Sequence, residues 1–173
     1  MAISTISNIT TGIGLGARPN LFRISFAGGL VGATTSTLSL LCKAGQVPAS
    51  TVGIIDVPMI GGRRYKIGGE RSFADWTVTV MNDGAFGNRT ALENYQKLFV
   101  SNDYNTTAVG ARSTTALTTV TVEHLGAAGE ITRTYKLNNC WPSDISTIDL
   151  SYDTTDALEE FSVTWTYDYF TVA

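Results

Sequence analysis

The chain has 173 residues, with 12 Lys and Arg against 15 Asp and Glu and a formal net charge of -3. General nucleic-acid binding needs clustered cations that displace counterions, so this balance excludes that class of protein. Hydrophobic residues make up 43% and charged residues only 16%, which predicts a real core and a surface built from Ser, Thr, Asn and Gly. Part of so uncharged a surface is expected to be covered by other subunits.

The first 17 residues and the rest of the chain are expected to differ, one as a flexible segment and the other as a folded domain. Residues 1–17 are rich in Ser, Thr, Gly and Ile and predict a flexible N-terminal arm that orders by docking on a neighbour. Residues 18–173 predict a single folded domain. The start lacks a basic segment followed by an apolar run, and no stretch approaches the length of a membrane span. We therefore expect a protein that is made and used in a cytoplasm, or exported without a cleaved signal.

The first elements of the domain are expected to be strands joined by a loop. Residues 21–26 alternate apolar and polar side chains and predict a strand. The Gly- and Thr-rich residues 28–37 predict a turn or loop, and residues 38–43 predict the returning strand.

Residues 52–67 predict a protruding β-hairpin arm in which Gly61-Gly62 forms a two-residue primed turn. Pro58 cannot donate a ladder hydrogen bond, which favours edge or protruding structure. One face of the first limb carries Ile55, Val57 and Met59, and the second limb carries Arg63, Arg64 and Lys66 with Tyr65 and Ile67 opposite. Because an isolated hairpin is marginal in water, the arm is expected to lie against a neighbouring subunit or against its own domain.

The centre of the predicted fold is the strand over residues 75–83. Its apolar side carries Trp76, Val78 and Val80, and its wetter side carries Asp75, Thr77, Thr79 and Met81. The turn Asn82-Asp83-Gly84 leads into a helix over about residues 88–101, with capping-box spacing from Thr90 to Glu93. Its apolar residues recur at helical spacing, so we expect this single helix to lie on a sheet.

The second half predicts further strands over residues 117–125, 131–137 and 145–152. In the last strand, one face is apolar and the other is polar. The apolar face comprises Phe161, Val163, Trp165, Tyr167 and Tyr169, and the polar face comprises Ser162, Thr164, Thr166 and Asp168. The fold class is therefore mainly β: an antiparallel β-sandwich or half-barrel with one flanking helix and exposed, Thr-rich edges that invite pairing with another chain.

No constellation for catalysis, metal binding or cofactor binding is found in the sequence. His124 is the single histidine and lies in an alternating strand, without a nucleophile elbow elsewhere in the chain. Cys42 and Cys140 lack zinc-site spacing; we interpret them as small buried thiols in a reducing compartment, with one bridge between them as the alternative. The acidic cluster Asp149, Asp153, Asp156, Glu159 and Glu160 lacks the spacing of a calcium loop. We expect no enzyme activity and no cofactor.

Several short sequence segments, taken together and in their order along the chain, resemble the tail tube proteins of contractile-tailed bacteriophages. They are Ala17-Arg-Pro-Asn-Leu-Phe22, Cys42-Lys-Ala44 followed by Val47-Pro-Ala49, Asp75-Trp-Thr-Val-Thr-Val-Met-Asn-Asp83, and Trp141-Pro142. The resemblance runs from about Ala17 to the closing strand. The loops at residues 28–37 and after Asn102 are peculiar to this sequence.

This resemblance implies a β-sandwich with one flanking helix and a protruding arm. It implies hexameric rings, in which subunit sheets join edge to edge into one barrel, and stacking of those rings into a tube inside the contractile sheath. The implied partners are other copies of the chain, the tail sheath protein, the tape-measure protein, the baseplate tube initiator and the tail terminator. DNA would pass as non-specific cargo, and the subunit itself would not insert into a membrane. The implied location is the virion tail, after assembly in the host cytoplasm.

The residues suggest two surfaces for such a tube. The predicted subunit or ring interface comprises Ile55, Val57, Met59, Ile60, Arg63, Arg64, Tyr65 and Lys66, with Asp153, Asp156, Glu159 and Glu160 as the acidic counterpart of the basic limb. The predicted bore lining comprises Ser162, Thr164, Thr166 and Asp168. A neutral to acidic bore offers phosphates no counterion-release affinity, so DNA would slide through it.

Two other functions remain open at this point. A related tube of a type VI secretion or extracellular contractile injection system would carry protein effectors through the same architecture. A monomeric carbohydrate-binding sandwich would use surface tryptophans, but Trp76 and Trp165 fall on apolar strand faces and argue against it.

Overall fold

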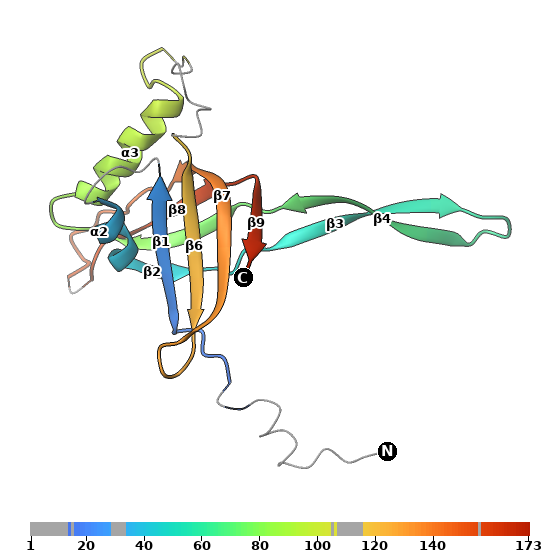
Figure 1. Ribbon diagram of the computed structural model, residues 1–173. Helices are drawn as coiled ribbons and strands as arrows, with labels where there is room; N and C mark the ends of the chain where they lie inside the picture. The colour runs from blue at the N-terminus through green and yellow to red at the C-terminus, as the bar shows by residue number, and fades with distance from the viewer. Residues whose placement is uncertain (1–13, 15, 29–33, 105, 107–115, 156) are drawn as a thin grey trace.

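The computed structural model describes residues 14, 16–28, 34–104, 106, 116–155 and 157–173. Within these residues the protein is mainly β (Figure 1). The strands are β1 (Phe22–Gly28), β2 (Cys42–Gly45), β3 (Ser50–Pro58), β4 (Arg64–Phe73), β5 (Trp76–Met81), β6 (Thr118–Leu125), β7 (Ile131–Ile145), β8 (Glu160–Thr166) and β9 (Tyr169–Val172). The helices of the described part are α2 (Thr34–Leu41) and α3 (Gly87–Phe99).

Seven strands form one antiparallel sheet in the order β1-β6-β7-β8-β5-β2, with β9 added on β7. The long strand β7 connects two layers, because its first half pairs with β6 and β9 and its second half pairs with β8. Asn139 lies between these halves with a φ of 59°, a left-handed conformation that asparagine tolerates better than most residues. The predicted end of the strand at residues 138–142 is therefore a bend inside one continuous strand.

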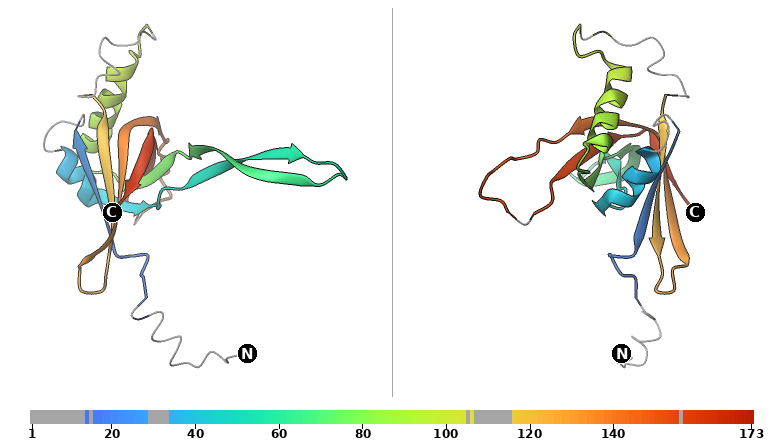
Figure 2. Two further views of the ribbon diagram at one scale, coloured as in Figure 1. Left: turned by 45° about the vertical axis from the view of Figure 1, so that its right-hand side comes forward. Right: turned by 90° about the vertical axis from the view of Figure 1, so that its left-hand side faces the viewer.

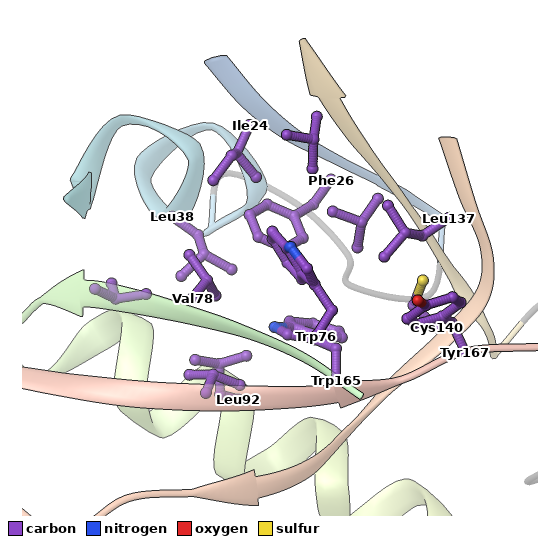
Figure 3. Close-up of a cluster of buried hydrophobic side chains, with 14 of the residues drawn as sticks. Ile24, Phe26, Leu38, Trp76, Val78, Leu92, Leu137, Cys140, Trp165 and Tyr167 are labelled. Atoms are coloured by element: carbon purple, nitrogen blue, oxygen red, sulfur yellow. The ribbon is translucent and has the colours of Figure 1, made fainter. Parts of the chain in front are cut away.

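The core lies between the two layers (Figure 3). Trp76, Val78 and Val80 are at most 1% exposed, as the alternation of the central strand predicts. Phe26 of β1 and Trp165 of β8 meet across the layers with ring centroids 5.3 Å apart. Burying large aromatic rings in this way supplies much of the apolar contact of a sandwich.

Helix α2 replaces the loop and the returning strand that were expected over residues 28–43; residues 29–33 lie outside the described part. The alternation Leu38-Ser39-Leu40 mimics a strand, but Leu38 is 1% exposed and Leu40 is 81% exposed. Leu41, three residues after Leu38, is the side chain that shares the inward helical face. The described part of the fold therefore has a second helix, and the strand starts only at Cys42.

Helix α3 begins at Gly87, before the predicted capping box at Thr90. The carboxylate of Asp83 accepts hydrogen bonds from the backbone N–H groups of Gly87 (3.0 Å) and Asn88 (3.1 Å). These donors are among the N–H groups that a helix start leaves without a partner, so Asp83 takes the role expected of Thr90. Leu92 and Tyr95 then face the core.

Two predicted strand features in the C-terminal part are wrong. The pattern Ile148, Leu150, Tyr152 forms no strand, since β7 ends at Ile145 and Leu150 and Tyr152 are 81% and 106% exposed. The last strand is divided: β8 ends at Thr166, and β9 crosses to pair with β7 in the other layer. Tyr169 consequently leaves the apolar face and is 47% exposed.

Strands β3 and β4 form a separate two-stranded sheet that extends away from the sandwich as an arm (Figures 1 and 2). They occupy the predicted hairpin region and lengthen it to residues 50–73. The predicted N-terminal arm lies outside the described residues except for Gly14, Gly16 and Ala17. None of the helices in the described segments combines the length and the hydrophobicity needed to cross a bilayer.

Candidate functional site

The arm has one apolar face, set by the register of its two strands. Ile55 lies opposite Ile67, and Val57 lies opposite Tyr65. Directly opposed residues of an antiparallel pair point to the same side, so these four side chains form one stripe, which Met59 continues toward the tip. We call Ile55, Val57, Met59, Tyr65 and Ile67 the arm stripe.

The arm stripe is uncovered. Ile55 is 54% exposed, Met59 58% and Tyr65 60%, and every residue of β3 is exposed. A contiguous row of apolar side chains in water marks an interaction surface more often than scattered single residues do. The arm does not fold back on its own domain (Figure 2), and its contact with a neighbouring subunit stays a prediction.

The opposite face of the arm is charged. Asp56 lies across from Lys66, and Arg64 makes an ion pair with Asp56 at 3.5 Å. An exposed pair of this kind stabilises by at most about 1 kcal/mol, so Arg64 remains available to another carboxylate.

The tip is a three-residue loop, and the predicted two-residue turn is wrong. The backbone N–H of Met59 donates to the carbonyl of Arg63 at 2.8 Å, which leaves Ile60, Gly61 and Gly62 as the loop. Gly61 and Gly62 have φ values of 93° and 80°, a region open to glycine at little cost. Ile60 is 106% exposed and Arg63 stands beside it at the end of the arm.

The acidic residues that were predicted to pair with the basic limb of the arm have separate partners or positions. Glu160 makes an ion pair with Lys43 of β2, and Glu159 accepts a hydrogen bond from Asn82 at 2.9 Å. Asp153 is exposed in the connection between β7 and β8, and Asp156 lies outside the described residues. Among the described residues, Asp153, Glu159 and Glu160 make no ion pair with the basic limb of the same chain, so that pairing stays a prediction about contacts between copies.

Three of the four predicted bore residues share one polar face. Ser162 and Thr164 of β8 lie opposite Thr79 and Thr77 of β5, and the two hydroxyls of Thr77 and Thr164 are 3.4 Å apart. Thr166 donates to Asp75 at 3.1 Å. Asp168 is separate: it lies at the bend between β8 and β9 and accepts a hydrogen bond from Asn139 at 2.7 Å.

The polar face therefore includes residues that the predicted site did not name. Asp75, Thr77 and Thr79 belong to it through the pairing of β5 with β8. Their alternation with Trp76 and Val78 was visible in the sequence, but the pairing that brings the two rows together was not.

The two cysteines and the histidine that were considered for catalysis or metal binding all lie in strands of the sheet. Cys42 and Cys140 are both free, and burial raises the pKa of each thiol to about 12, which keeps them protonated and unreactive. His124 lies in β6 opposite Phe22 and Arg133. Among the described residues, no group of three His, Cys, Asp or Glu is placed to hold a metal ion.

Sequence comparisons agree on one family. The family model described as phage tail tube protein matches residues 17–173. Tail tube protein gp19 of Enterobacteria phage T4 is 30% identical over 155 residues, which cover 88% of this chain and 90% of the relative. The tail tube protein of Serratia phage KSP90 is 26% identical over 128 residues, which cover 74% of this chain and 71% of the relative.

Solved structures share the fold. A chain in the anti-feeding prophage baseplate has a TM-score of 0.67 at 11% identity and covers 91% of this chain and 95% of its own length. A chain in the sheath-tube complex of an extracellular contractile injection system has a TM-score of 0.56 at 15% identity, with 99% of both chains covered. The protein is thus a component of phage tails with a structural and not a catalytic role. It belongs to the phage tail tube protein family.

Proposed function

We propose that this protein polymerises as stacked hexameric rings inside the contractile sheath and forms the conduit for DNA ejection into the host. The observation that carries the proposal is the arm stripe. A subunit whose β3 is exposed along its whole length has an element built for contact with something outside its own domain. In a tube, every arm would have the surfaces of identical neighbouring copies within reach.

Free strand edges support ring closure. Strands β1 and β2 end the sheet order and β9 pairs only with β7, so each of these described strands offers one unpaired row of backbone groups. Such edges recruit further strands, and joining them between copies in a closed ring removes them. Stacking of rings is a head-to-tail contact, which propagates into a filament.

The polar face of β5 and β8 is our candidate for the bore. It carries Ser162, Thr164, Thr166, Thr77 and Asp75. These side chains are neutral or acidic, so phosphates would gain little by releasing counterions there and DNA would slide. Asp168 would lie at the margin of that face, near the bend at Asn139.

The proposed partners follow from the family and from the assemblies in which similar folds occur. Similar chains come from a prophage baseplate, a tube-terminating cap and a sheath-tube complex. We therefore expect this chain to contact other copies of itself, a sheath protein, a baseplate initiator, a terminator and a tape-measure protein. Assembly would take place in the host cytoplasm before the tail joins the virion.

The test reverses the charge of the arm. Replacing Arg63, Arg64 and Lys66 with Glu is expected to block polymerisation and leave a folded subunit, because these three residues lie in the exposed outer part of the arm. Negative-stain microscopy and size-exclusion chromatography would report tubes, and circular dichroism would report folding. Lys97, Arg133 and Lys136 replaced with Glu make the matched control, since they change net charge equally outside the arm.

Tubes of normal length from the arm variant would rule out its role in assembly. A purified wild-type protein that stays monomeric at high concentration would count against the tube itself. Loss of assembly in both charge variants would assign the effect to net charge and not to the arm.

A tube of an extracellular contractile injection system is the second candidate, favoured by the fold likeness to such assemblies. That likeness concerns fold alone, whereas the 30% identical relatives are phage proteins. Neighbouring genes would separate the two, because capsid and terminase genes mark a phage.

A further inference from the structure

The outer edge of β1 is covered in the single subunit. The backbone N–H of Leu125 donates to the carbonyl of Leu21 at 2.9 Å, and these two residues continue the register of β1 with β6. Backbone groups alternate in direction along an antiparallel strand, so those of Ile24 and Phe26 point away from β6. Ile24 is nevertheless only 1% exposed and Phe26 only 7% exposed, so this row of backbone groups is shielded from water.

Helix α2 shields this edge. It packs against β1 on the side away from β6 (Figures 1 and 2). Its Leu38 points into the core beside Ile24 and Val78 (Figure 3). Covering an edge strand with a helix is one way in which proteins prevent the strand from pairing with other chains. A subunit that joins a neighbour through β1 must therefore first move α2.

The sequence of α2 gives a helix little support. Five of its eight residues are Ser or Thr, which have lower helix propensity than Ala, Leu and the long unbranched residues. Its first turn has no acidic residue and its last turn has no basic residue to interact with the helix dipole. The carbonyl of Leu38 accepts a hydrogen bond from the thiol of Cys42 at 3.1 Å, and a thiol is a weak donor. A helix this short is marginal by itself, so packing against the domain holds it in place.

The same segment has features of a strand. Thr is β-branched and favoured in strands. Leu38 and Leu40 are two residues apart and would share one face of an extended chain, whereas in the helix Leu40 is 81% exposed. Helix α2 ends at Leu41 and β2 begins at Cys42, so an extended segment would continue β2 without an intervening loop.

We propose that α2 is a conformational switch. It covers β1 in the free subunit; in the tube, residues 36–41 become extended, continue β2 and open the edge of β1 to a strand of a second copy. This inference rests on the proposed tube function and deepens it by naming the element that keeps a free subunit from polymerising. Contact with the second copy would bury Leu38 and Leu40 and pair the uncovered backbone groups of β1. The helix is retained in the free subunit because that contact is missing there.

Backbone chemical shifts test the switch directly. The Cα and carbonyl shifts of residues 36–41 are measured by solution NMR in subunits below the critical concentration and by solid-state NMR in assembled tubes. We expect helical values in the subunit and extended values in the tube, while residues 88–98 of α3 stay helical in both. Helical values in the tube, or extended values in the free subunit, would overturn the switch.

A pair of matched variants tests its energetic consequence. Ser36 and Thr37 are exposed on α2; replacing both with Ala favours the helix, whereas replacing both with Val favours a strand. Both variants lose the same hydroxyl groups, so the difference between them isolates the backbone preference. We expect the critical concentration for tubes to be about tenfold higher for the Ala pair than for the Val pair.

The same exchange at Thr90 and Asn94, two exposed positions of α3, is the control. Val should give no lower critical concentration than Ala there, because α3 stays helical in the tube. Equal critical concentrations for the two α2 variants, or the same advantage of Val in α3, would overturn the switch while the tube stands. A wild-type protein without tubes would overturn the proposed function and the switch with it.

Discussion

The hydroxyl of Tyr95 joins helix α3 to the start of β6 and to β7. It donates to the carbonyl of Ala116 and lies 3.5 Å from the carbonyl of Cys140, and Thr118 donates to it at 3.0 Å. Burial raises the pKa of Tyr95, so the group stays a hydrogen-bond donor over the whole neutral range. A buried polar group with partners of this kind orients the helix that carries it.

Tyr95→Phe is expected to lower the free energy of unfolding by about 1–2 kcal/mol, because the ring still packs but the carbonyl of Ala116 loses its donor. Urea titration followed by circular dichroism measures the change. Tyr104→Phe is the matched control, since Tyr104 is 83% exposed and should change stability little. Equal effects of the two substitutions would contradict the role of the hydroxyl.

A second residue, Asp83, makes the stability of α3 depend on pH. Hydrogen bonds from the backbone of Asn88 and Gly87 lower the pKa of Asp83 below its ordinary 3.8. A carboxylate with a depressed folded-state pKa stabilises the protein above its unfolded-state pKa, and this contribution is lost as pH falls through the folded-state pKa.

Asp83→Ala should therefore cost about 1 kcal/mol at neutral pH, as loss of a helix cap does. The gap between the variant and wild type should close as pH drops well below 3.8, which paired urea titrations across the acid range would measure. Asp103→Ala, at an exposed turn, should show neither effect. A gap that persists when the carboxyl is protonated would contradict the cap.

At the scale of elements, the arm is held by its own two strands. The register shifts between Val52 and Ile54, where Gly53 faces the backbone of Glu70. A Cβ at Gly69 would lie 3.3 Å from the backbone of Gly53, so the two limbs approach closely at this point. The two limbs of the arm therefore pack backbone against backbone at this point.

Replacing residues 54–67 with a short glycine turn should leave the sandwich intact. The replaced residues 54–67 contribute no side chain to the core cluster, so the free energy of unfolding should change by less than about 1 kcal/mol while tubes disappear. Leu92→Ala, at a side chain 0% exposed, is the opposite control and should cost about 2–5 kcal/mol. A large loss of stability on shortening the arm would show that it supports the domain.

At the scale of the whole molecule, the two layers each have an outer polar face, and a tube can place only one of them on its bore. The β5–β8 face carries Asp75 with the threonines of both strands. The other layer carries Ser25 opposite Thr121 and the ion pair of Arg23 with Glu123. The rows of the first face are acidic and neutral, and Lys43 of the neighbouring strand β2 is neutralised by its ion pair with Glu160, which suits passage of DNA.

Thiol labelling of assembled tubes distinguishes the faces. In Thr164→Cys tubes, a small maleimide should react, whereas a maleimide attached to a large globular protein should be excluded by the bore. Thr121→Cys, on the other layer, should react with both reagents. The reverse pattern would move the bore to the β1–β6–β7–β9 face.

Local alternation made the strand faces predictable. Trp76, Val78 and Val80 point inward because successive strand residues face opposite sides, and that rule needs only neighbours in sequence. The arm was likewise visible in its two glycines and in its row of alternating apolar residues. The predicted start of the helix at about residue 88 agrees with Gly87, but the predicted cap at Thr90 is wrong, because Asp83 and Thr90 are both plausible caps and only the path of the chain selects between them.

The sequence by itself determined the β-rich class, the inward rows of the central strands and the family, since these depend on residue identity and short-range order. Only the tertiary structure decided that residues 34–41 form a helix, that β7 bends from one layer to the other, and that β9 leaves the last strand. The physical reason is that each of these choices depends on which distant side chains and backbone groups become partners. Leu38 and Leu40 are alike in sequence, and the core has room for one of them.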